Sequence, residues 1–262
     1  PPDSPADFDS KNELEGLFCV GLYVVFGRGQ DEEEWLRNTE ALFQMCSEAK
    51  ITLHPKKTRL GYETAKMVGH EVGGGKIIVH QDNLEPLKTA VAPANKSEVR
   101  QFLGICGYGR KHVKEYAQKA KPLTELTGTK PFEWGPREQA SFEEVKADTL
   151  KNFPLHTADY SKPFYLFTDA SDVGAGAMLC QLTKEVEDAD IGKLRDHEKK
   201  VIAFYSAAWD EAMAKKPVYY REARALIWAM GKAKRHLECA QQETVLVSDH
   251  KRCDMSKLIY NF

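Results

Sequence analysis

The chain has 262 residues, of which 42% are hydrophobic, and its 37 Lys and Arg residues nearly balance 39 Asp and Glu residues to give a net charge of -2. This length and apolar fraction suffice for one large or two modest folded domains, and they exclude a globally disordered chain. Because the longest apolar run is far shorter than the roughly 20 residues of a membrane-spanning helix, we expect no membrane association.

The first part of the chain predicts a strand, a helix and a hairpin. After a polar leader, residues 17–26 have the apolar pattern of one strand or of one arm of a hairpin. Asp31 is a plausible helix N-cap with Glu34 as its capping-box partner, ahead of a helix of three or four turns. Residues 58–71 and 76–80 then indicate a hairpin across a run of three glycines.

The pattern becomes helical after residue 81. Asp82 and Ser97 each precede a helical pattern, and a third helix is expected from Arg110 to Ala120, where Pro122 would stop it. Pro136 opens one more helix before the C-terminal part of the chain. From residue 56 to residue 121, basic side chains outnumber acidic ones, which is typical of a surface that meets phosphates.

The C-terminal part predicts strands and one helix that carry three acids. Residues 164–181 read as two buried strands joined by a Gly-rich turn, and Asp169 ends the first strand. After a third strand, Pro217 starts a helix that contains Glu222, and Asp249 closes a further apolar run. Carboxylates at such positions suit hard divalent cations, which prefer oxygen ligands.

Each of the three acids also has a purely structural interpretation. Asp169 could form a turn with its own backbone, and Asp249 could cap a helix that follows it. Glu222 could pair with Arg221 or Arg224 on the same helix. These alternatives are more common for single residues than for three acids in this order.

Several short, separated motifs occur in order upstream of these acids: Pro55-Lys56-Lys57, Val68-Gly69-His70, the run Val99–Tyr108, the run Pro122–Leu126 and Phe132-Glu133-Trp134. Together with the three acids, they resemble the polyproteins of gypsy-type LTR retrotransposons from about Leu17 to about Asp254. Such polyproteins run from a reverse transcriptase palm through a thumb and connection into a ribonuclease H domain. The resemblance implies an α+β fold, with a partial palm and helical thumb/connection followed by a truncated, ribonuclease H-like mixed-sheet domain. The implied divisions are a polar leader at 1–16, the partial palm at 17–81, the thumb/connection at 82–155 and the ribonuclease H-like domain at 156–262.

Two departures from this family matter for function. Reverse transcriptases of the family carry an aromatic-X-Asp-Asp turn, and the register places Gly21 and Leu22 at the two aspartates, so we expect a degenerate polymerase site. The family's ribonuclease H domain also continues past the strand that Asp249 closes, with a fifth strand and a helix that delivers a fourth metal ligand. We therefore expect the open edge of strand 244–248 to be covered by another chain, by RNA or by a rearranged part of this chain.

The leading interpretation is a repurposed, polymerase-inactive protein that acts as a binding or structural subunit of a ribonucleoprotein assembly such as a ribosome. Its partners would be RNA and protein neighbours that cover the sheet edge. The residues expected to contact nucleic acid are Arg110, Lys111, Lys114, Lys119 and Lys121, although such a run is often only a solvated face.

The alternative is a Mg²⁺-dependent ribonuclease H that cuts RNA in RNA/DNA hybrids, as part of a retroelement polyprotein. In that case Asp169, Glu222 and Asp249 would hold two Mg²⁺ ions. A third possibility is an accessory subunit of an active reverse transcriptase. The six cysteines lack the close pairing of a zinc site and the density of a secreted scaffold, which favours an intracellular, reducing compartment and leaves an organelle such as the mitochondrion open.

Overall fold

The computed structural model describes residues 17–20, 23–26, 32–53, 58, 60–184, 194–248 and 258–260. The chain divides into two compact units, Pro1–Met67 and Val68–Phe262, and each is described by itself. Gly21, Leu22 and Asp249, together with the expected N-cap Asp31, lie outside the described residues.

The first unit contains a hairpin, a helix and a strand. Strands β1 (Leu17–Val20) and β2 (Tyr23–Phe26) pair antiparallel, so the segment predicted as one strand or one arm of a hairpin holds both arms. Helix α1 (Glu32–Glu48) has 17 residues and is longer than predicted. Its first turn carries three glutamates, which interact favourably with the positive end of the helix dipole. Strand β3 (Thr64–Met67) ends the unit.

The second unit opens with the predicted glycine hairpin. Strands β4 (His70–Gly73) and β5 (Lys76–Val79) pair antiparallel, and Gly74 and Gly75 adopt φ angles of 56° and 72°. Both angles lie in the left-handed region, which suits a two-residue hairpin turn and favours glycine. Strand β6 (Leu155–His156) joins the far side of β5, so the chain returns to this sheet after passing through the helices.

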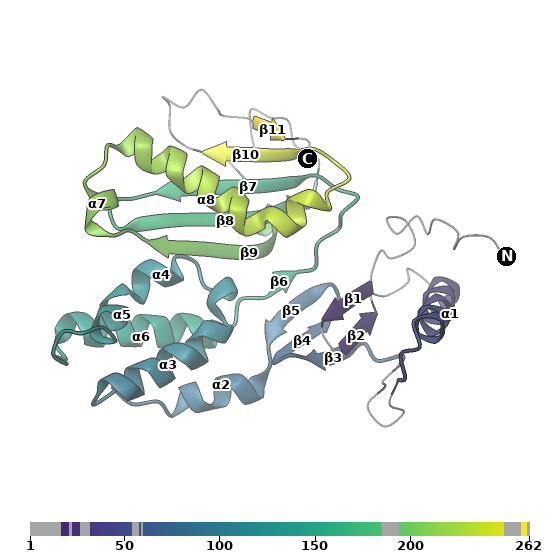
Figure 1. The fold of residues 1–262 in the computed structure, drawn as a ribbon, viewed down its shortest axis with the longest axis horizontal. Helices are drawn as coiled ribbons and strands as arrows, with labels where there is room; N and C mark the ends of the chain where they lie inside the picture. Colours follow the sequence, from purple (N-terminus) through teal and green to yellow (C-terminus); the bar gives the residue numbers. More distant parts are fainter. Residues whose placement is uncertain are drawn as a thin grey trace. The chain divides into compact units, whose positions relative to one another are not determined.

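Between β5 and β6 in the sequence, the chain forms a group of helices that packs around one apolar core (Figure 1). They are α2 (Gln81–Lys88), α3 (Lys96–Tyr108), the 3₁₀ helix η1 (Arg110–His112), α4 (Tyr116–Lys119), α5 (Lys121–Leu126) and α6 (Pro136–Lys151). At the centre, the Phe142 ring lies 4.7 Å from the Phe102 ring and 6.1 Å from the Trp134 ring, between centroids. The N-caps of α2 and α3 are His80 and Asn95, so the helices expected after Asp82 and Ser97 begin earlier than predicted.

The single helix expected from Arg110 to Ala120 is wrong. The segment breaks at Glu115, whose φ of 58° is left-handed, and Pro122 lies in the first turn of α5 instead of ending a helix. Contacts with two distant strands fix this shape: the Ala117 amide donates to Ser206 Oγ at 2.9 Å, and Gln118 Nε2 donates to the Ala175 carbonyl at 2.9 Å. Tertiary hydrogen bonds therefore override the local helical pattern.

The C-terminal part forms a five-stranded mixed sheet in the order β11-β10-β7-β8-β9. The strands are β7 (Phe164–Ala170), β8 (Gly174–Leu182), β9 (Lys199–Ala208), β10 (Thr244–Ser248) and β11 (Leu258–Tyr260). Strands β7, β8 and β9 are antiparallel neighbours, and β10 is parallel to β7. The short helix α7 (Glu211–Ala214) precedes α8 (Val218–Glu238), which lies across one face of the sheet (Figure 1). The α+β class and the mixed sheet are confirmed.

The outer edge of β10 is covered by this chain itself. Thr244, Val245 and Leu246 pair antiparallel with residues 260, 259 and 258 of β11. Of the three coverings that the sequence left open, the structure thus supplies the one from within the chain, and backbone groups that are costly to leave unpaired gain partners.

The remaining general expectations concern membranes and thiols. Within the described residues, no helix is long and apolar enough to cross a membrane. Cys46, Cys106 and Cys180 are buried free thiols, as expected for core cysteines, whereas Cys239 is exposed. Burial raises the pKa of Cys106 to about 11 and that of Cys180 to about 12, so both stay protonated near neutral pH.

Candidate carboxylate site and nucleic-acid interface

Two of the three predicted acids lie at the same end of the C-terminal sheet. Asp169 is exposed on β7, and Glu222 is buried in the second turn of α8, with 5% of its surface accessible. Ala170, the neighbour of Asp169, packs with Ala225, which lies one turn after Glu222. The packing of α8 on the sheet therefore brings the Glu222 turn to the end of β7.

The two acids approach that end from different sides of the strand. Side chains alternate along β7, and Asp169 follows Tyr165 and Phe167, whose cluster contains no residue of α8. Glu222 belongs to the helix that covers the opposite face. Across the part of the chain that the structure describes, no three His, Cys, Asp or Glu residues gather closely enough to hold a metal ion.

The strand register bears on the third acid. Strand β10 runs parallel to β7, and their pairing ends at Ser248 opposite Thr168. Asp169 follows Thr168 on β7, and Asp249 follows Ser248 in the sequence. Asp249 itself lies outside the described residues, so its place beside Asp169 stays a prediction.

Three of the predicted basic residues are exposed. Arg110 and Lys111 lie on η1, and Lys114 Nζ is 3.8 Å from a carboxylate oxygen of Glu115. Burial, and then the charge of Lys111, lower the pKa of His236 in the last turns of α8.

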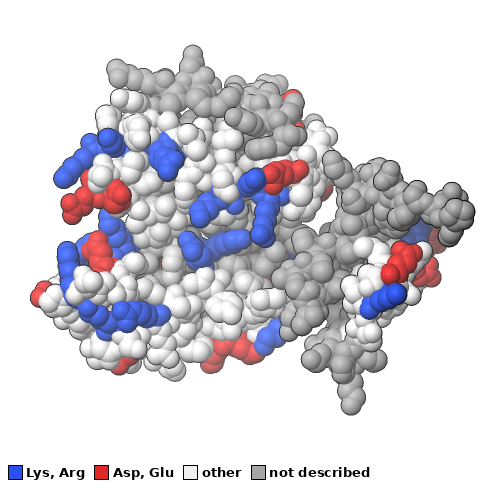
Figure 2. Space-filling view, viewed as in Figure 1, with Lys and Arg blue, Asp and Glu red and all other residues white. Residues whose placement is uncertain are grey.

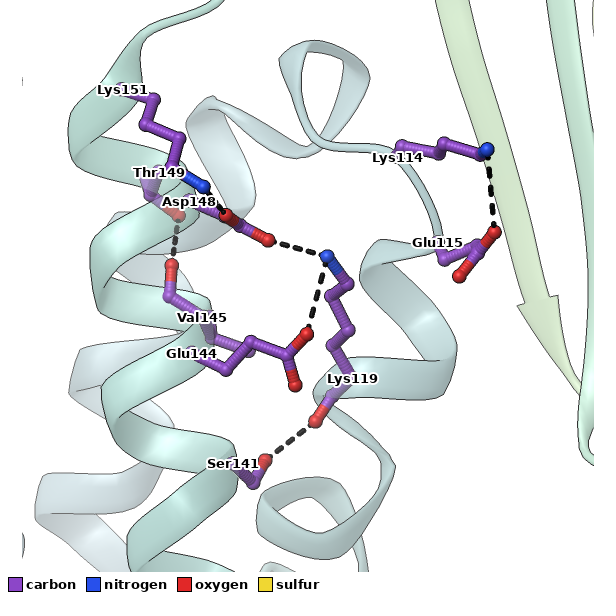
Figure 3. Close-up of polar contacts among 9 residues, drawn as sticks. All are labelled: Lys114, Glu115, Lys119, Ser141, Glu144, Val145, Asp148, Thr149 and Lys151. Atoms are coloured by element: carbon purple, nitrogen blue, oxygen red, sulfur yellow. Dashed lines mark hydrogen bonds and ion pairs between the residues drawn. The ribbon is translucent and has the colours of Figure 1, made fainter.

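The other two predicted lysines have structural partners. Lys119 Nζ forms ion pairs with Asp148 and with Glu144, the latter at 3.3 Å, and its side chain is only 21% exposed (Figure 3). Lys121 Nζ donates to the Trp209 carbonyl at 3.0 Å. These lysines tie α4 to α6 and the helices to the C-terminal sheet. The one sequence signal was the spacing of Glu144 and Asp148, four residues apart on α6.

The Lys119 network makes a pH-dependent contribution to stability. Burial raises the pKa of Asp148, but hydrogen bonds from Lys119 and Lys151 lower it more, so the net pKa lies below its ordinary value. A depressed carboxylate pKa stabilises the fold above the unfolded-state pKa, and this stabilisation is lost as pH falls through the folded-state pKa.

We therefore expect Asp148→Asn to lower the free energy of unfolding at pH 7 by about 1 to 3 kcal/mol, the range for hydrogen bonds to charged groups. Urea unfolding at several pH values measures this difference, which should shrink as pH falls below the ordinary aspartate range. Glu143→Gln, an exposed acid on the same helix, is the matched control. A pH-independent loss in Asp148→Asn would contradict the ion-pair explanation.

The outer face of α8 is a basic surface that the sequence interpretation missed. Its exposed basic residues are Arg224, Lys232, Lys234 and Arg235. The helix has two acids: Glu222 is buried, and the exposed Glu238 at its end pairs with Lys234 at 3.3 Å. Figure 2 shows Lys and Arg side chains gathered over α8 and continuing toward the helices below the sheet. The signal was present in the sequence as a helix whose acids and bases are unevenly distributed.

Comparisons with known proteins agree with the fold. Residues 134–245 match the family described as the RNase H-like domain found in reverse transcriptase. The chain is 26% identical over 223 residues to the Transposon Tf2-3 and Tf2-4 polyproteins of Schizosaccharomyces pombe (strain 972 / ATCC 24843), and these matches cover 85% of this chain. The matched region spans only 16% of the length of these polyproteins.

Solved structures show the same fold. The foamy viral protease-reverse transcriptase dRH in complex with double-stranded DNA has a TM-score of 0.71 and 17% identity, covering 92% of this chain and 41% of that one. The foamy viral protease-reverse transcriptase in complex with an RNA/DNA hybrid has a TM-score of 0.69 and 17% identity, covering 92% and 32%. The expected resemblance to gypsy-type retrotransposon polyproteins with reverse transcriptase and ribonuclease H parts is thus confirmed.

Proposed function

We propose that this chain, a reverse transcriptase/RNase H-like segment of the retroelement polyprotein type, binds nucleic acid and does not polymerise it. The observation that supports binding is a set of exposed basic residues on two elements, which we call the basic face: Arg110 and Lys111 on η1, and Arg224, Lys232, Lys234 and Arg235 on α8. Phosphate backbones are bound chiefly by such Lys and Arg clusters, with release of counterions.

The polymerase part of the proposal rests on two residues. Nucleotide addition requires carboxylates that hold two metal ions at the attacking and leaving oxygens. Gly21 and Leu22 stand where the family resemblance puts the paired aspartates, and neither side chain can bind a metal. The chain would therefore contribute binding and not nucleotide addition.

Charge reversal on η1 tests the binding surface. Arg110→Glu combined with Lys111→Glu should weaken binding to an RNA/DNA hybrid and reduce the slope of log affinity against log salt by about two to four, because two phosphate contacts are lost and two acids repel the backbone. Fluorescence anisotropy at several salt concentrations in EDTA measures both quantities.

Lys130 is an exposed basic residue between α5 and α6, and Lys130→Glu is the control for charge reversal away from η1. It should leave the salt slope near that of the unmodified chain. An unchanged slope in the double variant would indicate that η1 is only a solvated surface.

Within this function we propose a place in a ribonucleoprotein assembly such as a ribosome, where the chain would be a binding or structural subunit. Loss of the polymerase aspartates together with a preserved basic face favours this role over copying. Co-sedimentation of the native protein with RNA-containing particles, lost after ribonuclease treatment, is the expected result. Sedimentation as a free protein would reject the assembly.

A second candidate function is ribonuclease H cleavage of a hybrid. It is favoured by the pairing of β10 with β7, which ends one residue before both Asp169 and Asp249, and by the packing that brings the Glu222 turn to the same end. These three acids would hold Mg²⁺, which when bound would activate water and stabilise the leaving oxygen. The corresponding mutation is described in the Discussion.

A further inference from the structure

The first turn of α8 exposes two adjacent aromatic rings. Tyr219 is 57% exposed and Tyr220 is 46% exposed, and Val218 beside them is also exposed. Lys216 Nζ lies 5.6 Å from the centroid of the Tyr220 ring, within the range of a cation–π contact. Tyrosines with so much free ring surface are uncommon on a surface that only faces solvent, since each ring could bury a large apolar area.

These rings begin a ridge that follows α8. Tyr220, Arg224, Ile227 and Gly231 are spaced by four, three and four residues, so they lie on one side of the helix. All four are exposed, and Ile227 is 62% exposed. Lys234 and Arg235 continue the ridge, which is about 21 Å long from residue 220 to residue 234 at 1.5 Å per residue.

Gly231 leaves this ridge without a side chain at one position. Glycine inside a helix is unfavourable relative to alanine. Packing within the chain does not require it, because a Cβ built at this position would meet no atom within 4 Å. A smooth point between Ile227 and the basic residues suits close contact with a ligand backbone.

We propose that this ridge binds a single-stranded nucleic acid, with Tyr219 and Tyr220 stacking on unpaired bases. Bases in a duplex are stacked on one another and do not offer their faces to a protein, whereas unpaired bases stack on exposed aromatic rings. Arg224, Lys232 and Arg235 are exposed along α8, and the one exposed acid of this helix, Glu238 at its end, pairs with Lys234 at 3.3 Å. The remaining excess of bases matches a polyphosphate backbone rather than an apolar or basic peptide. The inference deepens the proposed nucleic-acid binding by naming the form that the α8 face selects.

The test is anisotropy of the full chain in EDTA, with a labelled single-stranded oligonucleotide and with the same strand in an RNA/DNA hybrid. Tyr219→Ser and Tyr220→Ser should each weaken single-strand binding about 30-fold, the middle of the range for one stacked base, and weaken hybrid binding far less. Tyr219→Phe and Tyr220→Phe keep the ring and should bind within about twofold of the unmodified chain. Circular dichroism of the Ser variants confirms that the exposed positions leave the fold intact.

The outcomes separate this inference from the proposed function. If both Ser variants bind the single strand as tightly as the unmodified chain and still bind the hybrid, the stacking proposal is rejected. Nucleic-acid binding by Arg110 and Lys111 on η1 would then remain. Equal losses for single strand and hybrid also overturn the stacking proposal, because the rings would then not select unpaired bases. Failure of the unmodified chain to bind either ligand overturns both proposals.

Discussion

Asp169→Asn should abolish any Mg²⁺-dependent cutting of the RNA strand in an RNA/DNA hybrid. Even groups that only support a metal ligand typically contribute about 10- to 100-fold to affinity or activity, so losing a ligand carboxylate should cost about 100-fold or more. The substitution keeps the size of the side chain and removes its charge. Because Asp169 is exposed at the end of β7, the fold should tolerate the change. Denaturing gels of a labelled hybrid measure the cleavage rate.

Asp172→Asn is the matched control, since Asp172 is an exposed acid in the turn between β7 and β8. It should leave the cleavage rate nearly unchanged. Cleavage that survives Asp169→Asn would show that the acids are assigned to the wrong site. A chain that does not cut the hybrid at all would reject the ribonuclease H candidate and leave the binding function.

Primer extension by this chain should be undetectable on any primed template with Mg²⁺ or Mn²⁺. The family resemblance puts Gly21 and Leu22 at the paired aspartates, and neither residue can bind a metal ion, so we expect no two-metal clamp on the attacking and leaving oxygens. Enzymes accelerate their reactions by about a millionfold or more, and a site without its metals loses most of this effect. Incorporation of a labelled nucleotide measures the reaction.

A competent reverse transcriptase on the same template is the positive control for the primer and the metal. Heat-inactivated chain gives the background. Extension above that background, reproducible across separate preparations, would refute the interpretation of Gly21 and Leu22 as a lost polymerase site.

The local patterns of the C-terminal sheet were predicted well from the sequence. The run around Asp169 gave the two strands β7 and β8 with the turn between them, and Pro217 correctly marked the start of α8. The glycine hairpin between β4 and β5 was equally clear. Alternation along a strand, positive φ at glycine and proline at a helix start are all decided by a few neighbouring residues.

The roles of the basic residues could not be predicted in the same way. Arg110 and Lys111 remain exposed, whereas Lys119 and Lys121 are held by Asp148 and by the Trp209 carbonyl. The pattern of charges was the same for all of them in the sequence. Lys119 is held by acids on α6, and Lys121 by a carbonyl just after β9, so only the packing of distant elements separated structural lysines from exposed basic residues.

The sequence by itself determined the family resemblance and the order of strands and helices in the C-terminal sheet. These depend on residue identity and on periodicity over one or two turns or strands. The tertiary structure decided that Asp169 and Glu222 approach from different sides of β7, that β11 covers β10, and that α8 presents a basic and aromatic ridge. Each of these depends on which distant elements pack together, and that choice is made by burial of the whole core rather than by any local segment.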